Sequence, residues 1–318
     1  MSKKESWIVP EKEGKLGRVD AWVAEQVEHS RSEVARWCKE GLILVNGVNC
    51  KPSLKLKGGE QIAAQIPEAH STDIIAEEMD LDILYIDSEV IVINKPAGLV
   101  VHPGKGNLSG TLVNGIVHLI EENTGERLRP GIVHRIDKDT SGILVIARTT
   151  LALQHLAKQF ADHSIERKYW ALVWGEVSAG KIDQALGRDP QNRLRFAVQE
   201  EGKWAVTHYQ CLAQGVPLKS GEGGRVSLVR CQLETGRTHQ IRVHMKHIGH
   251  PLVGDPLYGQ KQANAAWKPM LSRLSGQLLH ARTLGFQHPN GEWMRFSVAP
   301  PELFLEVMRF TRIVYSAE

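Results

Sequence analysis

The most concentrated group of chemically capable side chains lies in the stretch HRIDKDTSG, from His134 to Gly142. Short apolar runs flank it, GIV before and ILVIA after, and both are typical of β-strands. A charged turn between two strands lies at a sheet edge, where rigid elements can hold a reactive group in place. The same residue types also form ordinary solvated turns, so composition alone leaves both interpretations open.

Two metal-dependent chemistries match this stretch only in part. An EF-hand calcium loop fits the spacing of Asp137 and Asp139, but its twelfth position requires a glutamate where this chain has Arg148. A magnesium-dependent phosphotransferase of the DxD type also fits the two aspartates, but the chain continues into another strand without a helical crossover. We favour a third interpretation, in which Asp137 is the single essential carboxylate and the cations Arg135 and Lys138 keep it ionised.

A second group of polar side chains lies in LETGRTHQIRVH, residues 233–244. The alternation over its last five residues predicts a strand that places Gln240, Arg242 and His244 on one face. Residues 225–250 hold five arginines or lysines and four histidines against one glutamate, a pattern suited to phosphates or to a plain solvated face. The histidines lack neighbouring cysteines and an HExxH pattern, so we expect no metal there.

Tyr169 follows two basic residues in a strand-like run. An aromatic ring on a strand beside cations can stack on a nucleobase, although such a ring packs in a core about as often. The Gly- and Pro-rich segment 95–104 follows the strand-like VIVIN and predicts a loop. That loop either shapes the rim of a pocket or is a simple turn.

A compact first domain is predicted over residues 14–64. Apolar spacing predicts helices over 16–27 and 30–39, and a hairpin follows with its turn at Asn46 and Gly47. Residues 65–82 are acidic and weakly periodic, and we interpret them as a linker.

The predicted second domain, residues 83–318, consists mainly of short β-rich runs. Helical patterns interrupt these runs at 112–122, 151–160 and 301–310, without regular βαβ alternation. This arrangement predicts an α+β fold in which helices and loops flank an extended mixed or antiparallel sheet.

Composition excludes a largely disordered protein and a fibrous one. The chain has 318 residues, of which 42% are hydrophobic and 24% charged, as in ordinary globular proteins. A long apolar run and a signal-peptide core are both missing from the sequence, and the four cysteines form no CxxC pair, so we expect a cytoplasmic protein. The net charge of +3 is the sum of +2 over residues 1–60, −8 over 61–90 and +9 over 91–318. Two basic blocks therefore flank an acidic connector.

Four motifs, in this order, resemble those of RluA-type RNA pseudouridine synthases. They are INKPAGLVVHPG at 93–104, GIVHRIDKDTSGILVIAR at 131–148, LETGRTHQIRVHMKHIGHPLVGDPLYG at 233–259 and LLHARTLGFQHP at 278–289. The first domain resembles an S4 RNA-binding domain through RVD at 18–20, SRS at 30–32 and EGLILVNG at 40–47. The domain order is most similar to that of the group acting on the large ribosomal subunit.

This resemblance implies conversion of uridine to pseudouridine in RNA, without a metal or an organic cofactor. Asp137 matches the catalytic aspartate, Arg242 the arginine that pairs with it, and Tyr169 the tyrosine that stacks on the uracil. Arg135 matches the residue that enters the space left by the flipped base. Further substrate-binding residues are expected to be His134, Arg237, His239 and Gln240. Whether Asp137 attacks C1′, attacks the uracil ring or removes the 2′ proton stays open.

The resemblance also implies the partner. We expect 23S ribosomal RNA, alone or in pre-ribosomal particles, to be bound by a monomer that contacts no membrane. The RNA-binding residues expected in the first domain are Arg18, Ser30, Arg31, Arg36, Lys39 and Asn46. The alternatives are the same reaction on transfer RNA, and a non-catalytic S4 protein that binds RNA or assists ribosome assembly.

Overall fold

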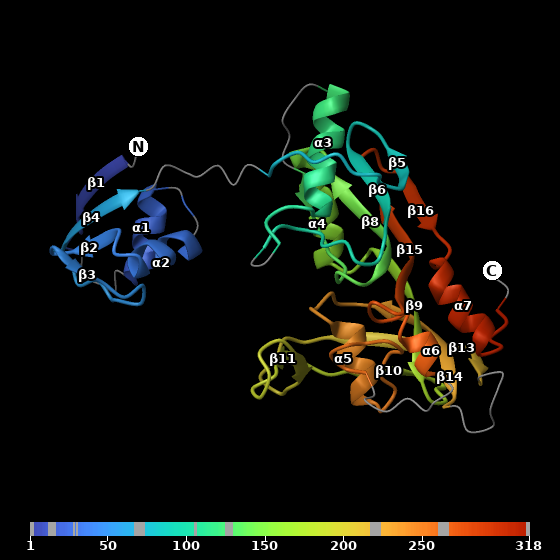
Figure 1. The fold of residues 1–318 in the computed structure, drawn as a ribbon. Helices are drawn as coiled ribbons and strands as arrows, with labels where there is room; N and C mark the ends of the chain where they lie inside the picture. The colour runs from blue at the N-terminus through green and yellow to red at the C-terminus, as the bar shows by residue number, and fades with distance from the viewer. Residues whose placement is uncertain are drawn as a thin grey trace. The chain divides into compact units, whose positions relative to one another are not determined.

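The chain forms two compact units, residues 1–73 and 74–318 (Figure 1). The computed structural model describes residues 3–11, 17–27, 29, 31–66, 74–104, 107–124, 130–216, 224–259 and 267–315.

The first unit is a four-stranded antiparallel sheet, in the order β1-β4-β2-β3, with two helices. Its elements are β1 (Lys3–Ile8), α1 (Val19–Val27), α2 (Arg31–Lys39), β2 (Ile43–Val45), β3 (Val48–Asn49) and β4 (Gln61–Ile66). The predicted hairpin turn is present, because Asn46 and Gly47 both adopt the left-handed backbone (φ 51° and 76°) that a two-residue turn requires. Strand β1 lies before the range predicted for the first domain, and it pairs with β4 along its whole length.

A separate hydrophobic core fills the first unit. Val19 and Val23 on α1 pack with Val34 and Trp37 on α2, against Ile62 of β4. The spacings of four and three residues place each pair on one helix face. This is the apolar pattern from which the two helices were predicted.

The second unit is built on a ten-stranded mixed sheet with the central order β10-β13-β14-β9-β15-β8-β6-β5. Neighbouring strands are antiparallel except β8 and β15, which run parallel. Its strands are β5 (Ile83–Ile86), β6 (Val90–Lys95), β7 (Gly131–Ile132), β8 (Ser141–Ala147), β9 (Glu166–Trp174), β10 (Ala179–Asp183), β13 (Val206–Gly215), β14 (Val226–Leu233), β15 (Leu279–Gln287) and β16 (Trp293–Ser297). A separate hairpin consists of β11 (Leu186–Arg188) and β12 (Phe196–Val198).

The described part of the second unit contains five helices, which flank this sheet. They are α3 (Leu112–Thr124), α4 (Thr150–Ala161), α5 (Gln240–His247), α6 (Lys268–Leu271) and α7 (Glu302–Phe310). The helices predicted at 112–122, 151–160 and 301–310 are confirmed, and so is the α+β fold with a mixed sheet. The strand predicted over residues 240–244 is wrong, because this segment is helix α5.

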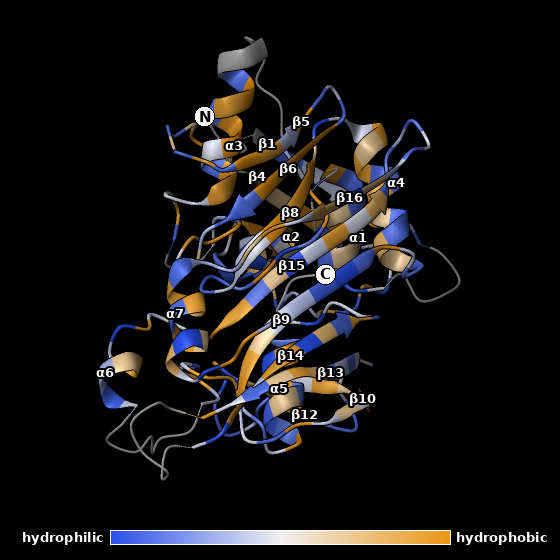
Figure 2. Ribbon diagram, turned by 90° about the vertical axis from the view of Figure 1, so that its right-hand side faces the viewer, coloured by the Kyte–Doolittle hydropathy of each residue, from blue (hydrophilic) through white to orange (hydrophobic). Residues whose placement is uncertain are grey.

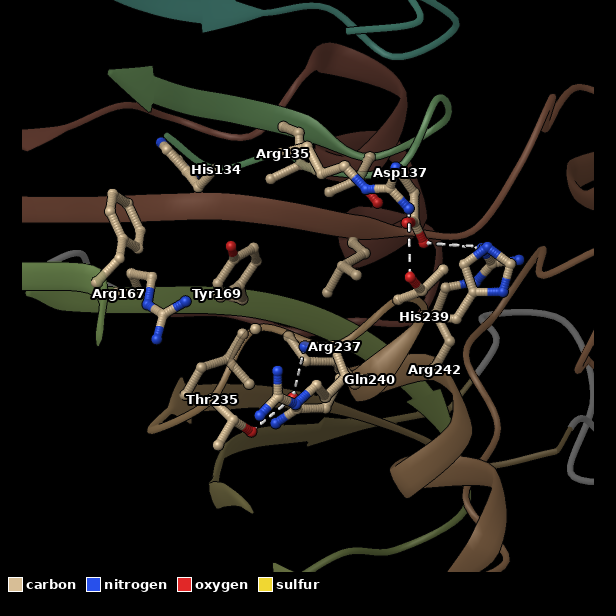
Figure 3. Close-up of a pocket in the computed structure, with 18 of the residues that line it drawn as sticks. His134, Arg135, Asp137, Arg167, Tyr169, Thr235, Arg237, His239, Gln240 and Arg242 are labelled. Carbon is tan, nitrogen blue, oxygen red and sulfur yellow. Dashed lines mark hydrogen bonds and ion pairs between the residues drawn. The ribbon is translucent and has the colours of Figure 1, made fainter. Parts of the chain in front are cut away.

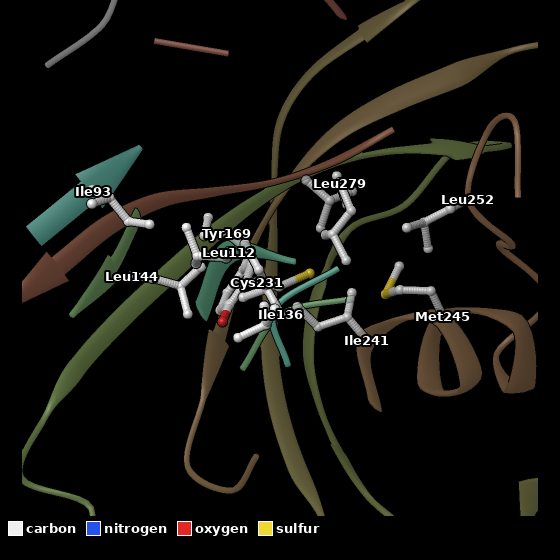
Figure 4. Packing of buried hydrophobic residues seen from close by; sticks show 14 of the residues in the cluster. Ile93, Leu112, Ile136, Leu144, Tyr169, Cys231, Ile241, Met245, Leu252 and Leu279 are labelled. Carbon is white, nitrogen blue, oxygen red and sulfur yellow. The ribbon is translucent and has the colours of Figure 1, made fainter. Parts of the chain in front are cut away.

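The core of the second unit lies against the central strands, which carry long hydrophobic stretches (Figures 2 and 4). At its centre, β8 and β15 approach each other closely. A Cβ atom added to Gly142 would lie 2.3 Å from the carbonyl oxygen of Ala281, and Gly142 has φ 111°. Only glycine fits such a position. Gly142 therefore allows β8 to lie directly against β15 at the point where the preceding charged loop ends.

Part of the segment interpreted as a linker lies on α3. Asn114 donates its side-chain amide to the backbone carbonyl of Ile75 (2.8 Å). The backbone carbonyl of Asn114 accepts the Glu77 N–H (3.1 Å). The Glu77 carboxylate accepts the N–H of Gly110 (2.9 Å). The segment around Ile75 and Glu77 thus packs at the start of α3 and belongs to the second unit. In the part of the chain that the structure describes, every helix is too short or too polar to cross a membrane.

Candidate active site

One pocket of the second unit, of about 590 Å³, gathers the predicted site residues of that unit (Figure 3). Its walls come from the loop after β7, from β9 and from the segment that leads into α5. The eight residues that the sequence nominated in this unit all line it: His134, Arg135, Asp137, Tyr169, Arg237, His239, Gln240 and Arg242. Residues more than 100 positions apart therefore meet in a single cavity.

Hydrogen bonds to the backbone fix the loop that carries Asp137. The loop turns where the Asp137 carbonyl accepts the Thr140 N–H (3.1 Å). The ammonium group of buried Lys95 donates to the carbonyl of Lys138 (2.9 Å) and to two carbonyls of residues 96–99. The INKPAG motif thus supports the loop that carries Asp137. It lies outside the pocket lining, so the pocket rim considered for this segment is not observed among the described residues.

Arg242 joins two aspartates. Its Nη1 donates to Oδ2 of Asp137 (2.8 Å), while its Nε and Nη2 donate to the two oxygens of Asp255 (2.7 and 2.9 Å). Burial alone lowers the pKa of Arg242, but its bonds to Asp255 and Asp137 outweigh burial and hold this pKa above its ordinary value. The guanidinium is therefore always charged and fixed in orientation, and the Asp137 carboxylate stays 23% exposed beside it.

His239 is the second neighbour of Asp137. Its Nδ1 is 2.8 Å from the Tyr258 hydroxyl and its Nε2 is 3.9 Å from Oδ2 of Asp137. Burial lowers the pKa of His239, although the nearby Asp137 charge opposes this. The imidazole is then neutral at neutral pH, so Arg242 is the cation that directly contacts Asp137.

Tyr169 forms a wall of the pocket from β9. Burial raises the pKa of Tyr169, so the phenol keeps its proton. Strand alternation places Arg167 on the same side as Tyr169, where it donates to the carbonyl of Glu234 (3.0 Å). Trp170 points to the opposite face and packs edge-on against Tyr315.

His134 and Arg135 line the pocket in different ways. The Nε2 of His134 accepts the Val145 N–H (3.1 Å), its ring stacks on Phe160 at 4.6 Å, and burial beside Arg167 lowers the pKa of His134 to about 3. Arg135 is exposed and donates to the Thr238 hydroxyl (3.2 Å). The histidine is therefore a fixed neutral group, whereas the arginine is exposed to solvent at the pocket.

Gln240 and Arg237 fasten the segment before α5. The Gln240 carbonyl accepts the Thr235 hydroxyl (2.8 Å) and the Arg237 N–H (3.0 Å), while its amide donates to the Val206 carbonyl (2.9 Å). Gln240 is buried in this network. Arg237 in turn donates its Nε to the carbonyl of Trp204 (3.0 Å).

The helical form of α5 changes which of its residues share a face. In a strand, Arg242 would lie beside Gln240 and His244, but in a helix it points about 200° away from Gln240. Gln240 and His244 both bond to the Thr207 hydroxyl on β13, whereas Arg242 reaches Asp137. The predicted common face is therefore wrong.

In the first unit, two of the predicted RNA-binding residues converge on Asp20. Arg18 donates two bonds to the buried Asp20 carboxylate (3.0 and 2.7 Å), and the Nε of Arg31 lies 3.3 Å from it. Burial alone raises the pKa of Asp20, but the two arginines outweigh burial and lower it. Both arginines keep part of their surface exposed.

The remaining predicted RNA-binding residues of this unit differ in their environment. Arg36 and Lys39 are exposed on α2, with Arg36 3.8 Å from Glu40. The side chain of Asn46 accepts the Gln61 N–H (2.8 Å) and so ties the hairpin turn to β4. Ser30 lies outside the described residues.

The sequence analysis missed several residues of the site, among them Arg167, Asp255 and Tyr258. Asp255 lies in the quoted PLVGDPLYG run, where an acidic residue among apolar and turn-forming neighbours is a signal of a buried, paired carboxylate. Its carboxylate also accepts the N–H groups of Leu257 and Tyr258 (2.9 and 3.0 Å). Among the residues that the structure describes, His, Cys, Asp and Glu nowhere form a group of three that could hold a metal ion.

Comparisons with known proteins agree with this geometry. The model of the RNA pseudouridylate synthase family matches residues 89–247, and the S4 domain model matches residues 17–62. The chain is 43% identical to the uncharacterized RNA pseudouridine synthase YlyB of Bacillus subtilis, over 96% of this chain and 97% of that protein. It is also 43% identical to the ribosomal large subunit pseudouridine synthase D of Xanthomonas campestris, over 93% of this chain and 89% of that protein.

A solved structure shows the same fold. Human RNA pseudouridylate synthase domain containing 4 superposes with a TM-score of 0.58 at 25% identity, over 73% of this chain and 93% of that one. The resemblance seen in the four motifs is thereby confirmed. The chain belongs to the RNA pseudouridylate synthase family, and it is an RNA pseudouridine synthase, an isomerase, with an N-terminal S4 domain.

Proposed function

We propose that this enzyme isomerises specific uridines of 23S ribosomal RNA and that Asp137 is its catalytic carboxylate. One observation carries the catalytic role: among the described residues, Asp137 is the single carboxylate that lines the pocket. Four arginines line the pocket with it: Arg135, Arg167, Arg237 and Arg242. A cavity with one reactive anion and several cations suits a phosphate-bearing substrate whose chemistry needs one carboxylate.

The reaction assigns a task to each group. The C1′–N1 bond breaks, the uracil turns, a C1′–C5 bond forms, the proton on C5 leaves and N1 gains a proton. Asp137 takes part in the bond exchange, Arg242 pairs with it and holds its orientation, and Tyr169 stacks on the uracil from the pocket wall. The target uridine must first leave its stack, at a cost of a few kcal/mol. Arg135, exposed at the rim, fills the space that the base leaves.

His134, Arg237, His239 and Gln240 play supporting parts in this proposal. His134 and Gln240 keep the walls in place through backbone bonds. Arg237 and His239 lie where the backbone of a flipped nucleotide passes. The S4 domain adds a second RNA contact through Arg18, Arg31, Arg36, Lys39 and the hairpin turn at Asn46. Ser30 is proposed for the same surface.

The choice of ribosomal RNA rests on relatives of this chain. Proteins named ribosomal large subunit pseudouridine synthase D in Xanthomonas campestris and in Escherichia coli are 43% and 40% identical to it, over nearly the whole length. Other relatives at the same identity carry no named RNA. Transfer RNA is the alternative substrate with the same chemistry.

The catalytic role is tested by Asp137→Asn. Since the C5 proton leaves in the reaction, tritium at C5 of uridine is released into water. We expect the variant to release this tritium at least about a thousandfold more slowly than the wild type. Asp139→Asn is the matched control, because Asp139 lies two residues away and outside the pocket lining. Equal loss in both variants, or release at the wild-type rate by Asp137→Asn, would overturn the assignment.

The substrate is tested separately by mapping pseudouridine in total RNA from cells that lack this gene. We expect modified positions to disappear from 23S RNA and to return with the wild-type gene but not with Asp137→Asn. Loss confined to transfer RNA would contradict the proposed substrate and leave the role of Asp137 intact.

A further inference from the structure

Trp204 lies beside the pocket, outside its lining, and is 49% exposed. It stands in the segment between β12 and β13, next to two residues that line the pocket. The His163 ring contacts its indole edge-on, with ring centroids 6.2 Å apart, and Arg237 donates to its carbonyl. The indole is therefore one residue removed from the cavity through His163, and the Trp204 backbone is one residue removed from it through Arg237.

This exposed ring is held in place. Its Nε1 donates to a carboxylate oxygen of Asp183 (2.9 Å). The backbone on one side is fixed by two bonds between Lys203 and Leu186 (both 2.9 Å), and on the other side the Ala205 carbonyl accepts the Gln184 N–H (3.1 Å). A rigid aromatic surface loses little conformational entropy when a flat ligand stacks on it.

Basic residues lie next to Trp204. Lys203 precedes it in the chain, Arg237 donates to its backbone carbonyl, and the His163 ring contacts the indole. Asp183, which accepts the indole N–H, is also paired with Lys181 (3.1 Å). An exposed aromatic ring beside arginine and lysine is a combination that binds single-stranded nucleic acid, because the ring stacks on a base and the cations attract the phosphates.

We infer that Trp204 is a stacking platform for the base of a nucleotide adjacent to the target uridine. When the target leaves its stack, its neighbours lose a stacking partner, and the indole replaces that partner on one of them. The platform is a second base-binding site, distinct from the one formed by Tyr169. The inference rests on the activity of the family on RNA and not on which RNA is modified.

The first test measures RNA affinity by fluorescence anisotropy in the Asp137→Asn background, with a short RNA that the active enzyme modifies. Trp204→Ala is expected to raise the Kd about tenfold, which corresponds to about 1.4 kcal/mol. Trp204→Phe should keep most of the affinity. Trp293→Ala is the matched control, because Trp293 is 55% exposed on β16, outside the pocket lining, and its loss should change nothing.

The second test identifies the nucleotide. Each neighbour of the target is replaced in turn by an abasic nucleotide, and at one position we expect a tenfold loss with Trp204 present and no further loss with Trp204→Ala. In the catalytically active background, Trp204→Ala should raise KM and leave kcat within about twofold. Losses that simply add at every abasic position, an unchanged Kd, or a fall in kcat at constant KM would each overturn the platform.

Discussion

Both units of this chain contain a buried charge shared by two partners of opposite sign, but the signs are reversed. In the S4 domain the buried group is the Asp20 carboxylate, and the partners are Arg18 and Arg31. In the catalytic unit the buried group is the Arg242 guanidinium, and the partners are Asp255 and Asp137.

The difference shows what each cluster leaves for function. Arg18 and Arg31 keep 43% and 55% of their side chains exposed, so the S4 cluster presents positive charge to solvent. The catalytic cluster presents one partly exposed carboxylate, since Asp255 is fully buried. The buried member orients its partners, and the exposed members determine whether the surface suits phosphates or the reacting nucleotide.

The largest effect is expected from removing the buried partner of Arg242. Asp255→Asn loses a two-bond ion pair in the interior and leaves the guanidinium with Asp137 alone. Breaking a buried pair on one side costs about 3–5 kcal/mol. We expect hydrogen exchange in peptides of α5 to accelerate accordingly, and tritium release to fall because Arg242 no longer holds Asp137 in one orientation.

Asp20→Asn is the matched control from the other unit. Its two arginines already reach solvent and can turn to water, so we expect a loss of about 1 kcal/mol, visible in peptides of α1 and α2. A loss as large as that of Asp255→Asn would show that the exposure of the partners does not distinguish the two clusters.

The sequence predicted the elements whose signal is local. The helices α3, α4 and α7 and the turn at Asn46 have apolar spacing or left-handed residues that any chain of this pattern would use. The strand prediction for residues 240–244 failed because their polar residues alternate over five positions. The apolar residues Ile241, Met245 and Ile248 have helical spacing instead, and they pack in or against the main core. Tertiary packing, and not the polar alternation, decides its conformation.

The site residues that lie within a recognisable sequence motif could be predicted. The loop around Asp137 and the arginine at 242 lie in motifs that stand out in the sequence, although 105 residues separate them. The burial of Asp255 has a signal in its sequence context, but its pairing with Arg242 could not be predicted, because a bond between a helix and a turn 13 residues later depends on how both pack. Arg167 could not be identified for a similar reason, since its partner is the backbone carbonyl of Glu234, directly after β14.

A smaller effect is expected from acid, and it should again separate the units. His280 is buried, with Nδ1 2.9 Å from the Ser141 hydroxyl and Nε2 3.1 Å from the Val298 carbonyl, and burial beside Arg282 lowers the pKa of His280 to about 4. Between pH 6.5 and 4 the unfolded chain therefore binds more protons than the folded one, so stability falls as the pH is lowered through this window, by about 3 kcal/mol for this residue.

The measurement is hydrogen exchange at pH 7 and at pH 4.5, corrected for the intrinsic pH dependence of exchange. Peptides of β8 and β15 should lose protection, whereas those of α1 and α2 should change less, because the described part of the first unit contains no buried histidine. His280→Gln should reduce the acid sensitivity of β15. Equal acid sensitivity of wild type and variant would show that other groups control it.

The smallest effect concerns the charges that the S4 domain leaves exposed. If Arg36 and Lys39 on α2 each contact one phosphate, replacing either with alanine should reduce the slope of log K against log salt by about 0.7–0.9 and weaken RNA binding only a few-fold at physiological salt. Arg309→Ala is the control, because Arg309 is equally exposed but lies on α7, bonded to Glu302. kcat should stay unchanged in all three variants, since none of these residues lines the pocket. An unchanged slope in the α2 variants would mean that Arg36 and Lys39 contact no phosphate, and the positive surface proposed for the S4 domain would then be limited to Arg18 and Arg31 beside Asp20.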